Sequence, residues 1–169
     1  MTFLDINNLP SGYTVVSEIN NSFYLGEITY LIQSDEDLVF LRKDPYDPSG
    51  FRSEDEPGYS VSQFIMPVSA VSWAYNVVTS IFWKLPNDGG ASPDMLHYKK
   101  NINGETIKLR FTPNCRREFE PGITISNLSR PGKIKKSTSI QIPYHLLREK
   151  GLVDQFKKIS DKYEFNDNR

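Results

Sequence analysis

The chain has 169 residues, of which 38% are hydrophobic and 24% are charged, so its composition is that of a globular protein rather than a disordered one. Its single cysteine, Cys115, excludes an internal disulfide framework and gives no basis for a cysteine-rich zinc cluster. No apolar run approaches the ~20 residues of a membrane span, and the first residues show no signal segment. We therefore expect a cytoplasmic or other reducing location and no membrane partner.

The net charge of −1 conceals a division of charge along the chain. Residues 1–92 hold 4 Lys and Arg against 12 Asp and Glu, whereas residues 93–169 hold 16 against 9, which gives net charges of −8 and +7. A basic half is a reason to look for a polyanionic partner. The charge alone leaves open the alternative that the two halves neutralise each other across an internal interface.

The first half is rich in strand-forming residues. The runs 23–32 and 38–42 predict two strands joined by a polar turn, and a Pro- and Gly-punctuated loop separates them from a third strand at 59–66. Pro67 then suits the start of a helix. Segment 68–85 is apolar with polar residues every three or four positions, which predicts a buried helix; its β-branched content keeps a strand as the alternative.

The second half repeats this order after a Pro- and Gly-rich linker at 86–93. Strands are predicted at 95–102, 106–111, 123–125 and 138–142, and Asn103-Gly104 is a hairpin signal between the first two. Pro143 opens a helix whose apolar residues continue at helical spacing to Tyr163, with Gly151 as a cap or kink.

The two halves align on each other. Segment 62–71 matches 138–147 at a constant offset of 76 residues, and in both a strand, a proline and a helix follow one another. The inferred unit is ββββα, used twice in a single α+β domain over 1–169, as an acidic repeat at 20–85 and a basic repeat at 94–163. One helix covers only one face of a sheet. Two units that pack through their helices therefore leave both antiparallel sheets facing outward.

The runs 23–30, 38–42 and 62–67 before a helix, with 123–143 in the second half, resemble the ββββα unit of the transcriptional positive-cofactor and Whirly families. The Lys-Gly-Lys motif typical of plant Whirly proteins is absent. The resemblance implies a Whirly-like fold and non-catalytic binding of single-stranded DNA or RNA, in a process such as transcription, replication or repair.

Single-strand binding needs cations for the phosphates and flat side chains on which bases stack. The second half supplies both. Lys108 and Arg110 share one face of a strand and Phe111 points to the other, into the core, so Tyr98 is the better stacking candidate. The predicted nucleic-acid-binding residues are Tyr98, Lys99, Lys100, Lys108, Arg110, Arg130, Lys133, Lys135 and Lys136. The alternative for each lysine is solubility and protection of a sheet edge.

An enzyme is not expected, and neither is a cofactor or a metal. His97 and His145 lack the spacing of metal ligands, no Gly-rich phosphate loop is present, and Cys115 has no identifiable general base. The rival function is a protein-interaction module or inhibitor that binds a basic partner through the acidic clusters at 35–37 and 54–56. If segment 68–82 is not buried within the chain, it would serve as a homo-oligomer contact.

Overall fold

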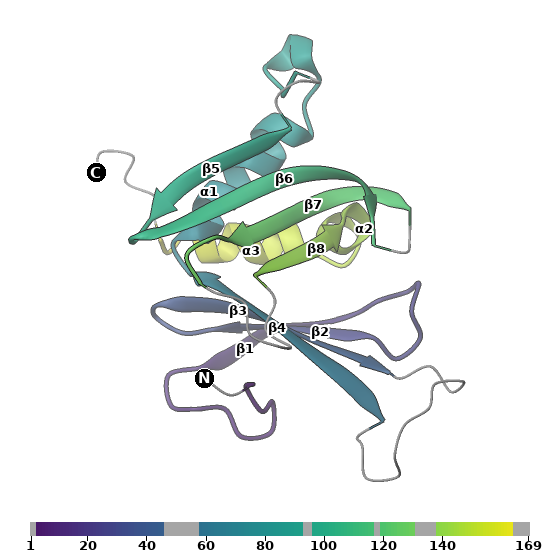
Figure 1. The fold of residues 1–169 in the computed structure, drawn as a ribbon, viewed down its shortest axis with the longest axis vertical. Helices are drawn as coiled ribbons and strands as arrows, with labels where there is room; N and C mark the ends of the chain where they lie inside the picture. Colours follow the sequence, from purple (N-terminus) through teal and green to yellow (C-terminus); the bar gives the residue numbers. More distant parts are fainter. Residues whose placement is uncertain (1–2, 46–57, 93–95, 117–118, 131–137, 164–169) are drawn as a thin grey trace.

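The computed structural model describes residues 3–45, 58–92, 96–116, 119–130 and 138–163. Within them the chain forms two four-stranded antiparallel sheets, and in each sheet the strands lie side by side in chain order (Figure 1). Sheet A consists of β1 (Thr14–Asn20), β2 (Ile28–Gln33), β3 (Asp37–Pro45) and β4 (Tyr59–Pro67), and sheet B of β5 (His97–Ile102), β6 (Glu105–Cys115), β7 (Glu120–Asn127) and β8 (Ser139–Pro143).

Helical segments follow each sheet. After sheet A come α1 (Ala70–Val77), a π-helical turn η1 (Val78–Phe82) and a 3-10 turn η2 (Pro86–Asp88). After sheet B come α2 (Tyr144–Arg148) and α3 (Leu152–Ser160), separated by Gly151 at φ 74°, a backbone conformation that favours glycine. The chain is therefore α+β in a two-repeat ββββα layout, and the segment after Pro67 is helical rather than extended.

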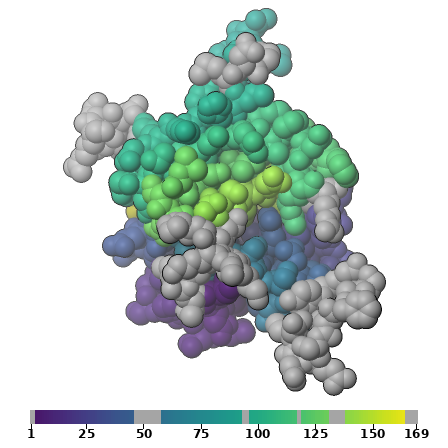
Figure 2. Space-filling view, viewed as in Figure 1, coloured from purple at the N-terminus to yellow at the C-terminus, as the bar shows by residue number. Residues whose placement is uncertain are grey.

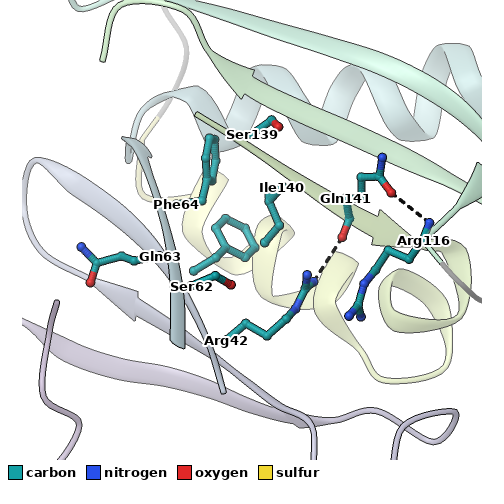
Figure 3. Close-up of a pocket in the computed structure, with 9 residues that line it drawn as sticks. Arg42, Ser62, Gln63, Phe64, Arg116, Ser139, Ile140 and Gln141 are labelled. Atoms are coloured by element: carbon teal, nitrogen blue, oxygen red, sulfur yellow. Dashed lines mark hydrogen bonds between the residues drawn. The ribbon is translucent and has the colours of Figure 1, made fainter. Parts of the chain in front are cut away.

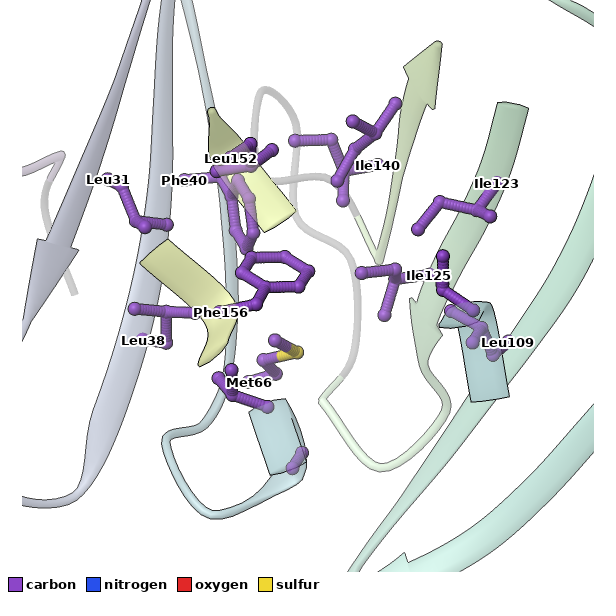
Figure 4. Packing of buried hydrophobic residues seen from close by; sticks show 14 of the residues in the cluster. Leu31, Leu38, Phe40, Met66, Leu109, Ile123, Ile125, Ile140, Leu152 and Phe156 are labelled. Carbon is purple, nitrogen blue, oxygen red and sulfur yellow. The ribbon is translucent and has the colours of Figure 1, made fainter. Parts of the chain in front are cut away.

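The helices lie between the two sheets and join them into one core. Phe156 of α3 packs edge-to-face on Phe40 of β3, with ring centroids 6.1 Å apart. On the other side Figure 4 shows Ile140 and Ile125 of sheet B facing the same helix. One cluster of buried side chains includes the inner faces of both sheets as well as α1, α2 and α3. Each sheet consequently turns its other face away from the helices.

The order strand, proline, helix recurs at the end of each sheet. Pro67 and Pro143 each end the fourth strand of their sheet. Met66 and Ile142, one residue earlier, are both buried and belong to the shared core. The constant sequence offset therefore corresponds to a repeated position in the fold.

The start of the first unit differs from the sequence prediction. Strand β1 was not predicted, and residues 23–27, expected to be extended, belong to the loop between β1 and β2. The loop is closed by a backbone hydrogen bond from Asn21 N–H to the carbonyl of Glu27, and Gly26 adopts φ 84°. Sheet A thus begins at Thr14, before the expected start of the repeat at residue 20.

The outer faces of the two sheets differ. On sheet A, the buried side chains Ile32, Val39 and Leu41 are covered by apolar residues of the N-terminal segment 3–13. The Leu4 amide also donates to Gln63 Oε1 at 2.9 Å, which anchors this segment on β4. Sheet A therefore has apolar side chains on both of its faces. The outer face of sheet B is polar.

Candidate nucleic-acid interface

Two rows of polar side chains cross the outer face of sheet B. Residues directly opposite each other on neighbouring strands share a face, and the residues between them, such as Leu109 and Ile125, are buried in the core. In the order β5 to β8, the outer rows are Lys99, Lys108, Ser126 and Ser139, and His97, Arg110, Thr124 and Gln141. The space-filling view shows the surface of sheet B across the upper part of the molecule (Figure 2).

The outer rows are cationic. They hold Lys99, Lys108 and Arg110 and contain no carboxylate. Lys99 and Arg110 are exposed and Lys108 is half-buried. Because Lys99 lies directly opposite Lys108, two like charges face each other, an arrangement that destabilises a sheet in the absence of an anion. The surface is therefore suited chemically to a polyanion.

Tyr98 does not lie beside these cations. It alternates with Lys99 on β5 and turns inward, where its ring packs against Phe82 at 5.8 Å between centroids. Lys100 lies on the same inward side of the strand as Tyr98 and Ile102. Phe111 is on the core side as expected, in ring contact with Phe82 and Tyr144. The outer rows consequently contain no Phe, Tyr or Trp, and their one aromatic ring is the imidazole of His97.

Arg130 is engaged in ion pairs. It donates from Nη2 to Asp37 Oδ1 at 2.8 Å and from Nε to Glu105 Oε2 at 2.7 Å. The hydrogen bond to Glu105 and the charge of Asp37 raise the pKa of Arg130. Burial alone would raise the pKa of Glu105, but the hydrogen bonds from Arg130 and Asn127 lower it. Arg130 therefore joins the two halves rather than extending the outer rows.

Three of the predicted residues, Lys133, Lys135 and Lys136, lie outside the described residues, as does the acidic cluster at 54–56. The other acidic cluster, at 35–37, supplies Asp37 to Arg130.

A second contact between the halves is centred on Glu27, whose side chain is 2% exposed. Arg116 donates to its two carboxylate oxygens at 2.6 and 2.7 Å, and Arg42 Nε lies 3.7 Å from Oε1. The halves thus do neutralise each other, at Glu27 and at Asp37. The three cations of the outer rows are not part of either contact.

The carboxyl groups of Glu27 and Asp44 have widely different pKa values. Burial alone would raise the pKa of Glu27, but hydrogen bonds from Arg116, Asp44 and Asn21 lower it to about 2. Burial, together with the hydrogen bond and charge of Glu27, raises the pKa of Asp44 to about 6. Near neutral pH, Glu27 is therefore the ionised partner of the two arginines, and Asp44 changes charge close to physiological pH.

A pocket of about 230 Å³ opens where the two sheets meet, between β4 and β8 (Figure 3). Its position follows from the packing of the two edge strands. Arg42 Nη2 reaches across it to the backbone carbonyl of Gln141 at 3.2 Å, and the backbone N–H of Arg116 donates to Gln141 Oε1 at 2.9 Å. The lining residues are Phe40, Arg42, Ser62, Gln63, Phe64, Arg116, Ser139, Ile140 and Gln141.

Sequence reasoning gave no role to His145, which is buried in α2. Its Nδ1 lies 2.7 Å from Glu120 Oε1 and its Nε2 lies 3.3 Å from Asn21 Oδ1, so it links α2 to β7 and to the loop after β1. Cys115 is buried at the end of β6. Within the described ranges, no group of three or more His, Cys, Asp and Glu side chains is arranged to hold a metal ion.

In the part of the chain that the structure describes, no helix is long and apolar enough to cross a bilayer. Comparison of the chain with family models, with curated proteins and with solved structures gives no match.

Proposed function

We propose that this chain is a non-catalytic binding protein for single-stranded nucleic acid and that the outer rows of sheet B contact the phosphates. The observation that carries the proposal is the facing pair Lys99 and Lys108 with Arg110 in the next row, because the described residues of these two rows include no carboxylate. A phosphate backbone laid over these side chains relieves their mutual repulsion and releases its own counterions. The layout of two ββββα units supports a Whirly-like fold, but a shared fold does not by itself specify a function.

The shape of the surface favours a single strand over a duplex. Four strands spaced about 4.8 Å apart give a face of about 14 Å. This is wider than the ~12 Å major groove of B-DNA, so the sheet would touch a duplex only at its outermost phosphates. An extended single strand, in contrast, is able to lie along the outer rows and contact all four strands.

The salt dependence of binding tests this proposal. Labelled single-stranded DNA and RNA oligonucleotides are titrated with protein by fluorescence anisotropy over a series of salt concentrations. The logarithm of the binding constant should fall linearly with the logarithm of the salt concentration, and Lys108→Gln should reduce that slope by about 0.7, the value for one phosphate contact on a single strand.

Lys157→Gln is the matched control, because Lys157 is an exposed lysine on α3, away from sheet B. It should leave the slope unchanged. No binding at low salt, or an equal change of slope in both variants, would show that the outer rows do not bind nucleic acid.

A further inference from the structure

The outer rows lead to the pocket between the sheets. Ser139 and Gln141 are the last residues of the two rows, and both also line the pocket. A single strand of nucleic acid that crosses sheet B from β5 toward β8 therefore reaches the rim of the pocket. The only aromatic ring in the rows is the imidazole of His97 at the β5 end, so a base near β8 has no ring of the rows on which to stack.

The pocket combines apolar walls with hydrogen-bond donors. Phe64 and Ile140 provide apolar surface on its two sides, one from each sheet (Figure 3). Its volume is below the ~300–1,000 Å³ of sites for drug-sized ligands, so it suits a single small ring system. An unstacked base held between apolar side chains and read along its polar edge is the usual mode of single-strand recognition.

Arg42 is the principal donor in the pocket. Its residue is 9% exposed, and it donates from Nε to Thr29 Oγ1 at 3.4 Å and from Nη2 to the carbonyl of Gln141. A guanidinium has five donor hydrogens, so Arg42 retains donors for a ligand. The Ser62 hydroxyl also lines the pocket and makes no hydrogen bond to another described residue.

On the side chains that line the pocket, hydrogen-bond donor hydrogens outnumber acceptor atoms. Gln141 Oε1 already accepts one hydrogen bond from the Arg116 amide, and the NH₂ group of Gln141 adds two donor hydrogens. Glu27 is bound by Arg116 and is not a lining residue. A base whose edge is rich in hydrogen-bond acceptors therefore fits the pocket best. Guanine presents O6 and N7, a pair that arginine reads bidentately, and thymine and uracil present two carbonyls, whereas adenine presents an amino donor.

We propose that the pocket between β4 and β8 accepts one keto base, guanine first, from the strand bound on sheet B. The inference rests on the proposed single-strand binding and adds a base preference to it. The phosphates of the strand lie over Lys99, Lys108 and Arg110. One base leaves the stack at the β8 edge and enters between Phe64 and Ile140, with its acceptor edge toward Arg42 and Ser62.

The test compares two unstructured oligonucleotides of equal length, alternating GT and alternating AC, in lithium buffer to prevent four-stranded guanine structures. Binding is measured by fluorescence anisotropy. The full chain should bind the GT oligonucleotide about tenfold more tightly than the AC oligonucleotide, a preference of the size expected for one well-read base. Ser62→Leu, which fills the pocket, should bind both with the affinity that the unaltered chain has for AC.

Thr14→Leu is the matched control, because it adds the same side chain at an exposed position of a strand in sheet A. It should keep the full preference. If Ser62→Leu does not fold, as judged by thermal melting, Arg42→Lys serves instead, since lysine keeps the charge but loses the bidentate fork. That variant should also lose the preference for GT.

The outcomes separate the two proposals. Equal affinity of the unaltered chain for GT and AC, or an unchanged preference in a folded Ser62→Leu or Arg42→Lys variant, overturns the base pocket and leaves the phosphate surface standing. Failure to bind either oligonucleotide overturns the proposed function, and the base pocket with it.

Discussion

Lys99 on β5 lies directly opposite Lys108 on β6, so two lysines face each other on the outer side of sheet B. Opposed like charges on neighbouring strands destabilise a sheet, whereas opposite charges at the same positions stabilise it. The row beside them places His97 opposite Arg110, and neither row offers a carboxylate to balance the charge. This face of the sheet is thus arranged at some cost to stability, as expected of a surface whose cations serve binding.

The first prediction separates stability from binding. Lys99→Glu replaces the repulsive pair with an attractive one, so the free energy of unfolding should rise by about 0.5 kcal/mol. The affinity for single-stranded DNA should fall, because one phosphate contact becomes a repulsion. Urea denaturation and fluorescence anisotropy measure the two effects. Lys150→Glu, at an exposed position beyond α2, should change neither the stability nor the affinity. A loss of stability in Lys99→Glu would contradict the repulsion between Lys99 and Lys108.

The second prediction concerns the pH dependence of stability through Asp44. Its pKa is raised to about 6 in the folded protein, whereas an aspartate in an unfolded chain ionises near 3.9. The folded state therefore holds the proton more tightly, and the stability that this proton provides is present below about pH 4 and is lost as pH rises through about 6.

Asp44→Asn keeps a neutral hydrogen-bond donor to Glu27 at every pH. The variant should match the unaltered chain in melting temperature near pH 4 and exceed it increasingly up to about pH 7, with no further change above. Glu27, whose pKa is lowered to about 2, stabilises both proteins above about pH 4.5, and that contribution fades in both toward pH 2. A difference in melting temperature that is constant with pH would contradict this assignment.

The third prediction concerns the N-terminal segment on sheet A. Leu4 and Leu9 pack on the buried residues Ile32, Val39 and Leu41. Leu4→Ala and Leu9→Ala should each lower the free energy of unfolding by on the order of 1 kcal/mol, because partly buried methylene groups are lost. Neither should remove binding of single-stranded DNA, since the phosphates are proposed to lie on the outer rows of sheet B.

Leu25→Ala provides the comparison for these variants. Leu25 is 96% exposed in the loop between β1 and β2, so its truncation should leave the stability unchanged. If all three leucine variants unfold at the same urea concentration as the unaltered chain, the segment does not cover the sheet in solution.

Much of the fold follows from local sequence patterns. The strand–proline–helix junctions at Pro67 and Pro143 were predictable because alternation, a proline and a helical apolar pattern coincide there twice. Strand β1 was missed because its sequence, TVVSEIN, mixes polar and apolar residues at a sheet edge. Tyr98 could have been placed inward by alternation alone, since it shares a face with the buried Ile102.

Features that depend on contacts between the halves could not be predicted. The residues around Arg130 in the sequence give no sign of an ion pair, because its partner Asp37 is 93 positions away. Glu27 and Arg116 are 89 positions apart, and nothing near either residue identifies the other. The pocket arises only when β4 and β8 are brought together, so its mixture of donors and apolar walls has no sequence signature.

A charge-matched pair of triple variants tests the proposal that the outer rows of sheet B bind single-stranded nucleic acid. One variant carries Lys99→Glu, Lys108→Glu and Arg110→Glu, and the other carries Lys84→Glu, Lys150→Glu and Lys158→Glu at exposed positions elsewhere. Both change the net charge equally, so long-range electrostatics are the same in sum. At low salt, fluorescence anisotropy should detect no binding by the first variant and near-normal binding by the second. Equal affinities of the two variants would contradict the proposal.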